Sequence, residues 1–139
     1  MQFHNYKEKV LIIDFGSQVT KLIARRIREL GVYSEIITPQ DLTKVKKFYN
    51  IKGLILSGGP STVTANTFQS VPKNIFEKKI PILGICYGLQ LIAKIFGGKI
   101  KSSKKKREFG RATLYKKNTS LLTKDFLNNK RSVWMSHED

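Results

Sequence analysis

The chain has 139 residues, and 26 Lys and Arg against 10 Asp and Glu give a formal net charge of +16 at pH 7. This length suits one domain, and a hydrophobic content of 40% can form a core, so wholesale disorder is excluded. No apolar stretch is long enough to cross a membrane and the polar N-terminus has no secretory signal, so we expect a soluble cytoplasmic protein. The single cysteine, Cys86, excludes an internal disulfide framework and a cysteine-rich zinc site.

The positive charge raises the question of nucleic-acid binding. Of the 26 basic residues 20 are Lys and only six are Arg, although Arg makes most bidentate contacts to bases and phosphates. The densest basic run, residues 99–107, carries six positive charges in nine residues. We interpret this run as a solvated loop, with contact to a polyanion as the alternative, and we do not expect nucleic acid as a partner.

The first elements in chain order are a strand and a helix. Residues 10–13 form a short apolar run, which is typical of a strand covered on both faces. A helix of about 13 residues follows, with Ser17 as its N-cap and Gly31 just beyond its end. The residues expected on its apolar side are Val19, Leu22, Ile23, Ile27 and Leu30.

The remaining pattern continues the alternation of strands and helices. A polar, helical connection is expected between the second and third strands, and a helix over 88–96 would present Leu89, Ile92, Ala93 and Phe96 on one side. The further strands are predicted over 34–37, 53–56 and 80–85, and in a more irregular region over 111–116 and 131–136.

This order of elements predicts an α/β fold: an open, mostly parallel twisted sheet with helices on both faces. Ligands of such sheets bind at the carboxyl ends of the strands. Three glycine-rich breaks follow strands here, after Ile13, after Leu56 and around Cys86. We therefore expect these breaks to converge at one edge of the sheet.

The most informative segment is Gly84-Ile85-Cys86-Tyr87-Gly88, which closes a buried strand and opens a helix. It has the pattern of a nucleophile elbow with cysteine as the nucleophile. Glycines two residues before and after Cys86 remove side chains that would collide in this sharp turn. The N-terminus of the following helix favours the thiolate. Candidate donors for a developing oxyanion are the amide of Tyr87 and the Gly58-Gly59 turn, although such a turn can also be purely structural.

Five segments of the sequence carry a resemblance to a known family: Asp14–Gln18, Leu22–Glu29, Ile55–Pro60, Gly84–Gln90 and Val133–His137. In these segments the sequence resembles the glutamine amidotransferase domain of the GMP synthetases, a class I glutamine amidotransferase. The resemblance covers essentially the whole chain and implies a flavodoxin-like fold. The elbow is common to the class, whereas the narrower resemblance depends on the first and last of these segments and on Tyr87.

The resemblance implies that Cys86 attacks the side-chain amide of glutamine and releases ammonia through a glutamyl thioester. Gly58, Gly59 and Tyr87 would line the oxyanion hole and substrate cleft. Gln90 and the backbone near Ser136 and His137 would help to hold the glutamine. In the family, the ammonia passes to an ATP-dependent synthetase domain that aminates XMP to GMP. No cofactor or metal is implied for this chain, because ATP and magnesium belong to the synthetase domain.

The family's catalytic base lies in a His-Pro-Glu motif beyond the segment that ends at His137. This sequence stops at Asp139, and its histidines, His4 and His137, are not followed by a glutamate two residues later. Glu138 also replaces a glycine that is common in the family. We therefore expect residues 1–139 to be one amidotransferase domain, incomplete at its C-terminus, without a second domain.

Two other functions remain open from the sequence. The chain could be the glutaminase subunit of a sister pathway, such as anthranilate or carbamoyl phosphate synthesis. It could also be a degenerate, non-catalytic fold that binds polyanions through residues 99–107. That function predicts binding that weakens steeply with salt and an unreactive Cys86.

Because nucleophile and base act as a unit, we expect the 139-residue chain alone to have little or no glutaminase activity. Ammonia release from glutamine by the purified chain measures this. Robust turnover that disappears in Cys86→Ala would contradict the expectation.

Overall fold

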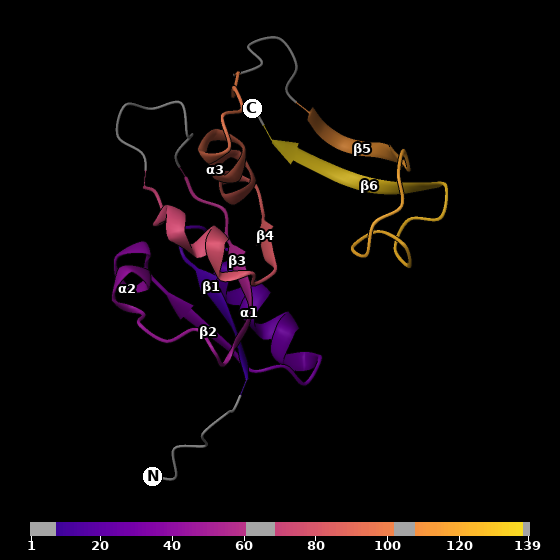
Figure 1. Ribbon diagram of the computed structural model, residues 1–139. Coiled ribbons are helices and arrows are strands. Elements are labelled where there is room, and N and C mark those ends of the chain that lie inside the picture. Colours follow the sequence, from indigo (N-terminus) through magenta and orange to yellow (C-terminus); the bar gives the residue numbers. More distant parts are fainter. Residues whose placement is uncertain (1–7, 61–68, 102–107, 138–139) are drawn as a thin grey trace. The chain divides into compact units, whose positions relative to one another are not determined.

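The computed structural model describes residues 8–60, 69–101 and 108–137 (Figure 1). The chain forms two compact units, residues 1–100 and 101–139. In the described residues no helix is long and apolar enough to cross a membrane.

A four-stranded parallel sheet forms the centre of the first unit. Strand β1 (Lys9–Ile13) lies between β2 (Ser34–Ile37) and β3 (Ile51–Leu56), and β4 (Ile82–Gly84) pairs with the other side of β3. The parallel pairing and the alternation with helices confirm the predicted α/β class. The fourth strand is shorter than the predicted 80–85.

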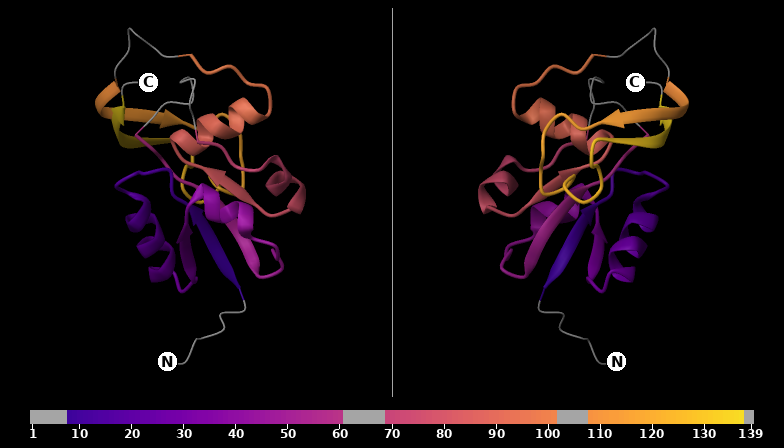
Figure 2. Two further views of the ribbon diagram at one scale, coloured as in Figure 1. Left: turned by 90° about the vertical axis from the view of Figure 1, so that its left-hand side faces the viewer. Right: turned by 90° about the vertical axis from the view of Figure 1, so that its right-hand side faces the viewer.

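Helices cover both faces of this sheet (Figure 2). Helix α1 (Thr20–Glu29) lies on one face. The short helix α2 (Pro39–Lys44), the 3-10 helix η1 (Lys73–Lys78) and α3 (Tyr87–Ile95) contribute to the core on the other. Thr38 caps α2 by accepting a hydrogen bond from the Asp41 amide at 3.1 Å.

The larger core lies on the face opposite α1. Leu11 and Ile13 stand in register with Leu54 and Leu56, so these four side chains point to the same face. They are at most 1% exposed and pack in one cluster with residues of the covering helices. These helical residues are Leu42, Ile75 and Leu91.

Two features predicted for α1 were wrong. Its N-cap is Val19, without a side-chain cap, and the Ser17 hydroxyl instead accepts the Val19 amide in the preceding turn at 3.2 Å. The helix buries Thr20 and Ala24, whereas three residues of the predicted apolar side are exposed. Small side chains allow the helix axis to approach the sheet, and the larger ones then lie at its flanks. The exposed residues are Val19, Leu22 and Leu30.

The predicted apolar side of α3 was wrong in part, because Ile92 packs against the core whereas Leu89 and Phe96 are exposed. Leu89 and Phe96 are 60% and 68% exposed, and the helix buries Tyr87, Gly88 and Leu91. Gly88 decides this orientation because its Cα faces the end of β3 at very short range. A side chain on Gly88 would place its Cβ 2.1 Å from the carbonyl oxygen of Leu56.

The second unit contains the antiparallel pair β5 (Glu108–Tyr115) and β6 (Lys130–His137), which agrees with the strands predicted there. Phe109, Tyr115 and Trp134 share one face of this pair, because alternate residues of a strand and residues paired directly across the two strands point to the same side. All three are more than 60% exposed.

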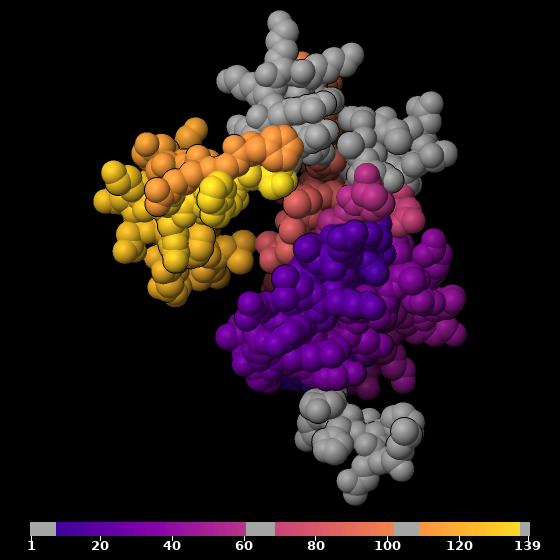
Figure 3. Space-filling view, turned by 180° about the vertical axis from the view of Figure 1, so that it is seen from behind, coloured from indigo at the N-terminus to yellow at the C-terminus, as the bar shows by residue number. Residues whose placement is uncertain are grey.

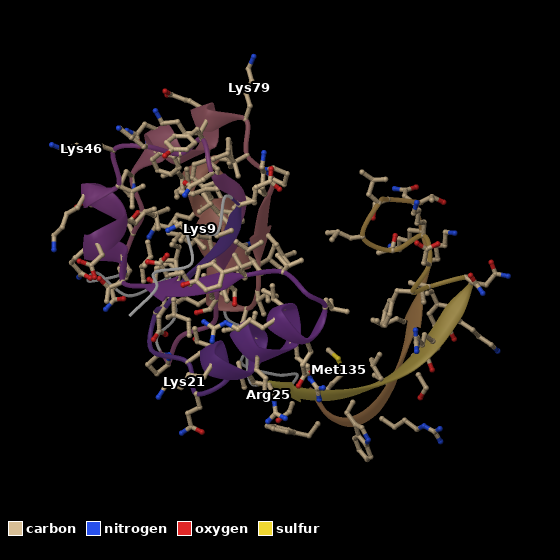
Figure 4. The ribbon with its side chains drawn as sticks, turned by 90° about the horizontal axis from the view of Figure 1, so that it is seen from below. Lys9, Lys21, Arg25, Lys46, Lys79 and Met135 are labelled. Atoms are coloured by element: carbon tan, nitrogen blue, oxygen red, sulfur yellow. The ribbon has the colours of Figure 1, made fainter. Side chains whose placement is uncertain are left out.

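The basic side chains of the first unit are dispersed. Figure 3 shows the α1 side of this unit, where Arg25 and Arg26 both pair with Glu29 at 2.9 Å. Lys21 in α1, Lys46 after α2 and Lys79 after η1 point outwards (Figure 4). Most lysines in the described part of this unit are exposed to solvent. Residues 102–107 of the basic run lie outside the described residues.

The close contact between α3 and β3 predicts that Gly88→Ala destabilises the protein by more than about 2 kcal/mol, because the new methyl group overlaps backbone atoms. Urea unfolding followed by circular dichroism measures the change. Gly53→Ala is the matched control: its Cβ would lie 3.8 Å from its nearest neighbours, so we expect a change below about 1 kcal/mol. Equal stabilities of the two variants would contradict the contact.

Candidate functional site

Cys86 lies on the sharp turn between β4 and α3. Its backbone angles, φ 48° and ψ −112°, are rare for a residue with a side chain. The turn is held by two hydrogen bonds, from the Ile85 amide to the Leu56 carbonyl at 2.9 Å and from the Gly88 amide to the Ser57 carbonyl at 3.1 Å. β3 therefore supports the strained turn from both sides of Cys86.

The two flanking glycines are required by packing. A Cβ on Gly84 would lie 2.7 Å from the Leu89 nitrogen, and a Cβ on Gly88 would overlap Leu56. Backbone atoms cannot give way as a flexible side chain can. The spacing Gly84–Cys86–Gly88 thus has a steric cause, as the sequence predicted for an elbow.

The turn leaves Cys86 accessible at the positive end of a helix. Cys86 is a free, exposed cysteine and the N-cap residue of α3. Its carbonyl accepts the Gln90 amide at 3.1 Å, so the helix begins directly at the cysteine. The first amides of α3 carry the positive end of the helix dipole. This position suits a thiol that reacts as an anion.

The three strand ends converge as predicted. A Cβ built on Gly58 would lie 3.4 Å from the Ser17 Oγ and 3.6 Å from the Cys86 Cβ. Gly58 follows β3, Ser17 follows β1 and Cys86 follows β4. The carboxyl-terminal edge of the parallel sheet thus brings the three glycine-rich breaks together around the thiol.

Two backbone N–H groups near Cys86, those of Gly59 and Tyr87, are candidates to donate hydrogen bonds to a negatively charged oxygen. Neither Gly59 nor Tyr87 donates a backbone hydrogen bond to an acceptor within the described part of the chain. Gly59 is packed tightly, since a Cβ there would lie 2.9 Å from the Phe15 carbonyl oxygen. Tyr87 follows Cys86 directly and Gly59 follows Gly58, which lies against Cys86, so both amides are candidate donors to an oxyanion.

The ring of Tyr87 packs the elbow against neighbouring segments of the first unit. It packs against Phe15 with ring centroids 4.9 Å apart, and its hydroxyl donates to the Gln69 carbonyl at 2.6 Å. Burial raises the pKa of Tyr87, so the phenol stays protonated and remains a donor at neutral pH. This side chain connects α3 to the β1 loop and to the segment before η1.

A buried polar group supports the same edge and was missed in the sequence. The Thr20 hydroxyl lies 3.0 Å from Asp14 Oδ1 and 3.1 Å from the Ser57 Oγ. Thr20 is 1% exposed and Ser57 is fully buried. Polar residues at these positions, within otherwise apolar helix and strand ends, were the available signal.

The other predicted site residues lie in different parts of the structure. Gln90 is half-buried in the first turn of α3, near Cys86 in sequence. Ser136 and His137 lie on β6 in the second unit, paired with Phe109 and Glu108. No cluster of three metal-ligating side chains occurs among the described residues. His4 lies outside them.

The comparison with known proteins agrees with this geometry. The family model for "Glutamine amidotransferase class-I" matches residues 11–139. The GMP synthase [glutamine-hydrolyzing] of Borrelia garinii subsp. bavariensis is 48% identical over 130 residues, which are 94% of this chain and 24% of that protein. The Staphylococcus epidermidis protein of the same name is 43% identical over 139 residues, all of this chain and 26% of that protein. The chain thus spans about a quarter of these relatives.

Solved structures show the same fold. A Thermoplasma acidophilum protein provisionally assigned as a GMP synthase subunit has a TM-score of 0.78 at 32% identity, and the match covers 97% of this chain and 67% of that one. A glutamine amido transferase from Methylobacillus flagellatus, 16% identical, has a TM-score of 0.64, with coverage of 95% of this chain and 55% of the other. The chain belongs to the class I glutamine amidotransferase family.

Proposed function

We propose that this chain is the glutaminase portion of a GMP synthetase-like enzyme, with Cys86 as its nucleophile. The observation that carries the proposal is the strained, exposed Cys86 at the start of α3, bordered by Gly58 of the neighbouring strand end. A buried structural cysteine would need neither the positive φ nor the flanking glycines. The family membership supplies the reaction class.

In the proposed reaction, the Cys86 thiolate attacks the side-chain amide carbon of glutamine. A C–S bond forms, and the amide oxygen takes up the negative charge. The amides of Gly59 and Tyr87 stabilise this oxyanion, with Gly58 leaving room beside the thiol. Collapse of the tetrahedral intermediate breaks the C–N bond, and the nitrogen takes up a proton from water and leaves as ammonia. Water then hydrolyses the glutamyl thioester, which yields glutamate and restores the thiol.

The remaining part of the proposal concerns the substrate and its destination. Gln90, Ser136 and His137 would hold the glutamine, as the family resemblance implies. The ammonia would pass to an ATP-dependent synthetase part that aminates XMP to GMP in purine biosynthesis. ATP and magnesium would bind there and not in this chain. The relatives' greater length supports a separate synthetase part.

A glutamine analogue with a chloromethyl ketone in place of the carboxamide should alkylate Cys86. We expect one adduct per chain, at Cys86 by peptide mass spectrometry, with a saturable rate that glutamine slows, because the ketone occupies the place of the amide. Cys86→Ser should form no adduct. The corresponding asparagine analogue, one methylene shorter, is the matched control. Equal reactivity of the two analogues, or labelling indifferent to glutamine, would contradict a glutamine site.

Ammonia delivery is tested with this chain and its synthetase part together, either fused in one polypeptide or combined as two. We expect GMP formation from XMP and ATP with either glutamine or ammonium as nitrogen donor. Cys86→Ala should abolish the glutamine-dependent reaction and leave the ammonium-dependent one intact, since only glutamine requires the thiol. Amination of a different acceptor, with no reaction of XMP, would show that the chain serves a sister pathway.

A further inference from the structure

Ser57 occupies a position that joins all three strand ends of the site. Its amide donates to the Ile13 carbonyl of β1 at 3.1 Å, and its carbonyl accepts the Gly88 amide of α3 at 3.1 Å. Its hydroxyl lies 3.1 Å from the Thr20 hydroxyl and 3.2 Å from the Gly58 carbonyl oxygen. The residue is fully buried. Every polar atom of Ser57 is therefore engaged with a segment that borders Cys86.

The Ser57 side chain points towards α1, away from the larger core. Leu56 faces α3, and successive side chains of an extended strand point to opposite faces. Thr20, in the first turn of α1, meets the Ser57 hydroxyl there and also contacts Asp14 Oδ1, which accepts the Gly16 amide at 2.9 Å. Thr20 thus fixes the direction of the Ser57 side chain from the opposite side of the sheet.

The hydroxyl protons can complete a chain that ends on the backbone. When Thr20 donates to Ser57, Ser57 keeps its own proton for the Gly58 carbonyl. Asp14 meanwhile retains the Gly16 amide as a donor. Ser57 supplies the one hydrogen bond to the Gly58 carbonyl found within residues 8–60, 69–101 and 108–137.

The hydrogen bond to the Gly58 carbonyl also affects the Gly59 amide, because the peptide group between these residues is planar. The carbonyl of Gly58 and the amide of Gly59 belong to one trans peptide, so they point in opposite directions. A hydroxyl that holds the carbonyl towards the interior also directs the Gly59 N–H away from it. Neither glycine has a side chain to restrict the rotation of this peptide. The hydrogen bond from Ser57 therefore favours one orientation of this peptide.

We propose that Ser57, held by Thr20, is a positioning residue that orients the Gly58–Gly59 peptide so that the Gly59 N–H receives the oxyanion formed when Cys86 attacks the substrate amide. This inference rests on the proposed function of Cys86 and adds two residues to it. Neither touches the substrate; both act through the Gly59 amide.

Two probes of Cys86 separate orientation of this amide from general integrity of the site. With the glutamine chloromethyl ketone, the thiolate first adds to the carbonyl carbon, so negative charge develops on oxygen. Sulfur then displaces chloride from the adjacent methylene carbon, and the carbonyl re-forms as its bond to sulfur breaks. Iodoacetamide alkylates the thiolate by direct displacement at its methylene carbon, without an oxyanion. The ratio of the two second-order rate constants therefore reports on oxyanion stabilisation. Both are measured on the purified full chain.

Ser57→Ala should lower the chloromethyl ketone rate about tenfold and change the iodoacetamide rate less than about twofold, since loss of a single oxyanion donor costs more than this. The variant keeps both backbone hydrogen bonds of Ser57, and Thr20 still has Asp14 as an acceptor. Thr20→Val should shift the ratio in the same direction, and Thr20→Ser should restore it. Circular dichroism checks that the variants are folded.

Ser34→Ala is the matched control. Ser34 is also fully buried, and its hydroxyl donates to the Ala24 carbonyl at 3.0 Å, between α1 and β2. Its loss should leave the ratio unchanged. An unchanged ratio in Ser57→Ala, whether both rates stay the same or both fall equally, would overturn the positioning role of Ser57 and leave the proposed function of Cys86 standing. The unsubstituted chain provides a separate test of the proposed function. If it reacts with the ketone no faster than a simple thiol that has the same iodoacetamide rate, the proposed function fails, and the inference fails with it.

Discussion

The contact between the first turn of α3 and the end of β3 is the constraint on which the rest of this site depends. At Gly88 the helix backbone approaches Leu56 so closely that no side chain fits. The approach brings the Gly88 amide to the Ser57 carbonyl and the Ile85 amide to the Leu56 carbonyl. Those two bonds hold Cys86 at a positive φ and present its thiol at the edge of the sheet.

The same contact explains why the site is assembled from three separate segments. Once α3 is fixed on β3, the loops after β1 and β3 meet beside Cys86, and their glycines face neighbouring residues. Gly58 lies against Ser17 and Cys86, and Gly59 lies against Phe15. Polar support comes from the other side of the sheet, through Thr20 and Ser57. The site is thus held between a steric contact on one face and a hydrogen-bonded group on the other.

The wrong predictions about the buried sides of α1 and α3 share a physical cause. Periodicity identifies where apolar residues recur along a helix, but the buried side is the one on which the helix can come closest to the sheet. In α1 that side contains Thr20 and Ala24, and in α3 it contains Gly88 and Leu91. Leu22, Leu89 and Phe96 lie outside the contact.

The sequence by itself determined the α/β class, the strands β1 to β3, and the elbow around Cys86, because continuous apolar runs and glycine spacing are local signals. It also indicated that the glycine-rich breaks meet, since carboxyl ends of parallel strands share an edge. Only the tertiary structure decided which faces of α1 and α3 are buried and that Thr20 meets Ser57 across 37 positions of sequence. Such contacts depend on how closely two backbones approach, and no pattern within one segment encodes that distance.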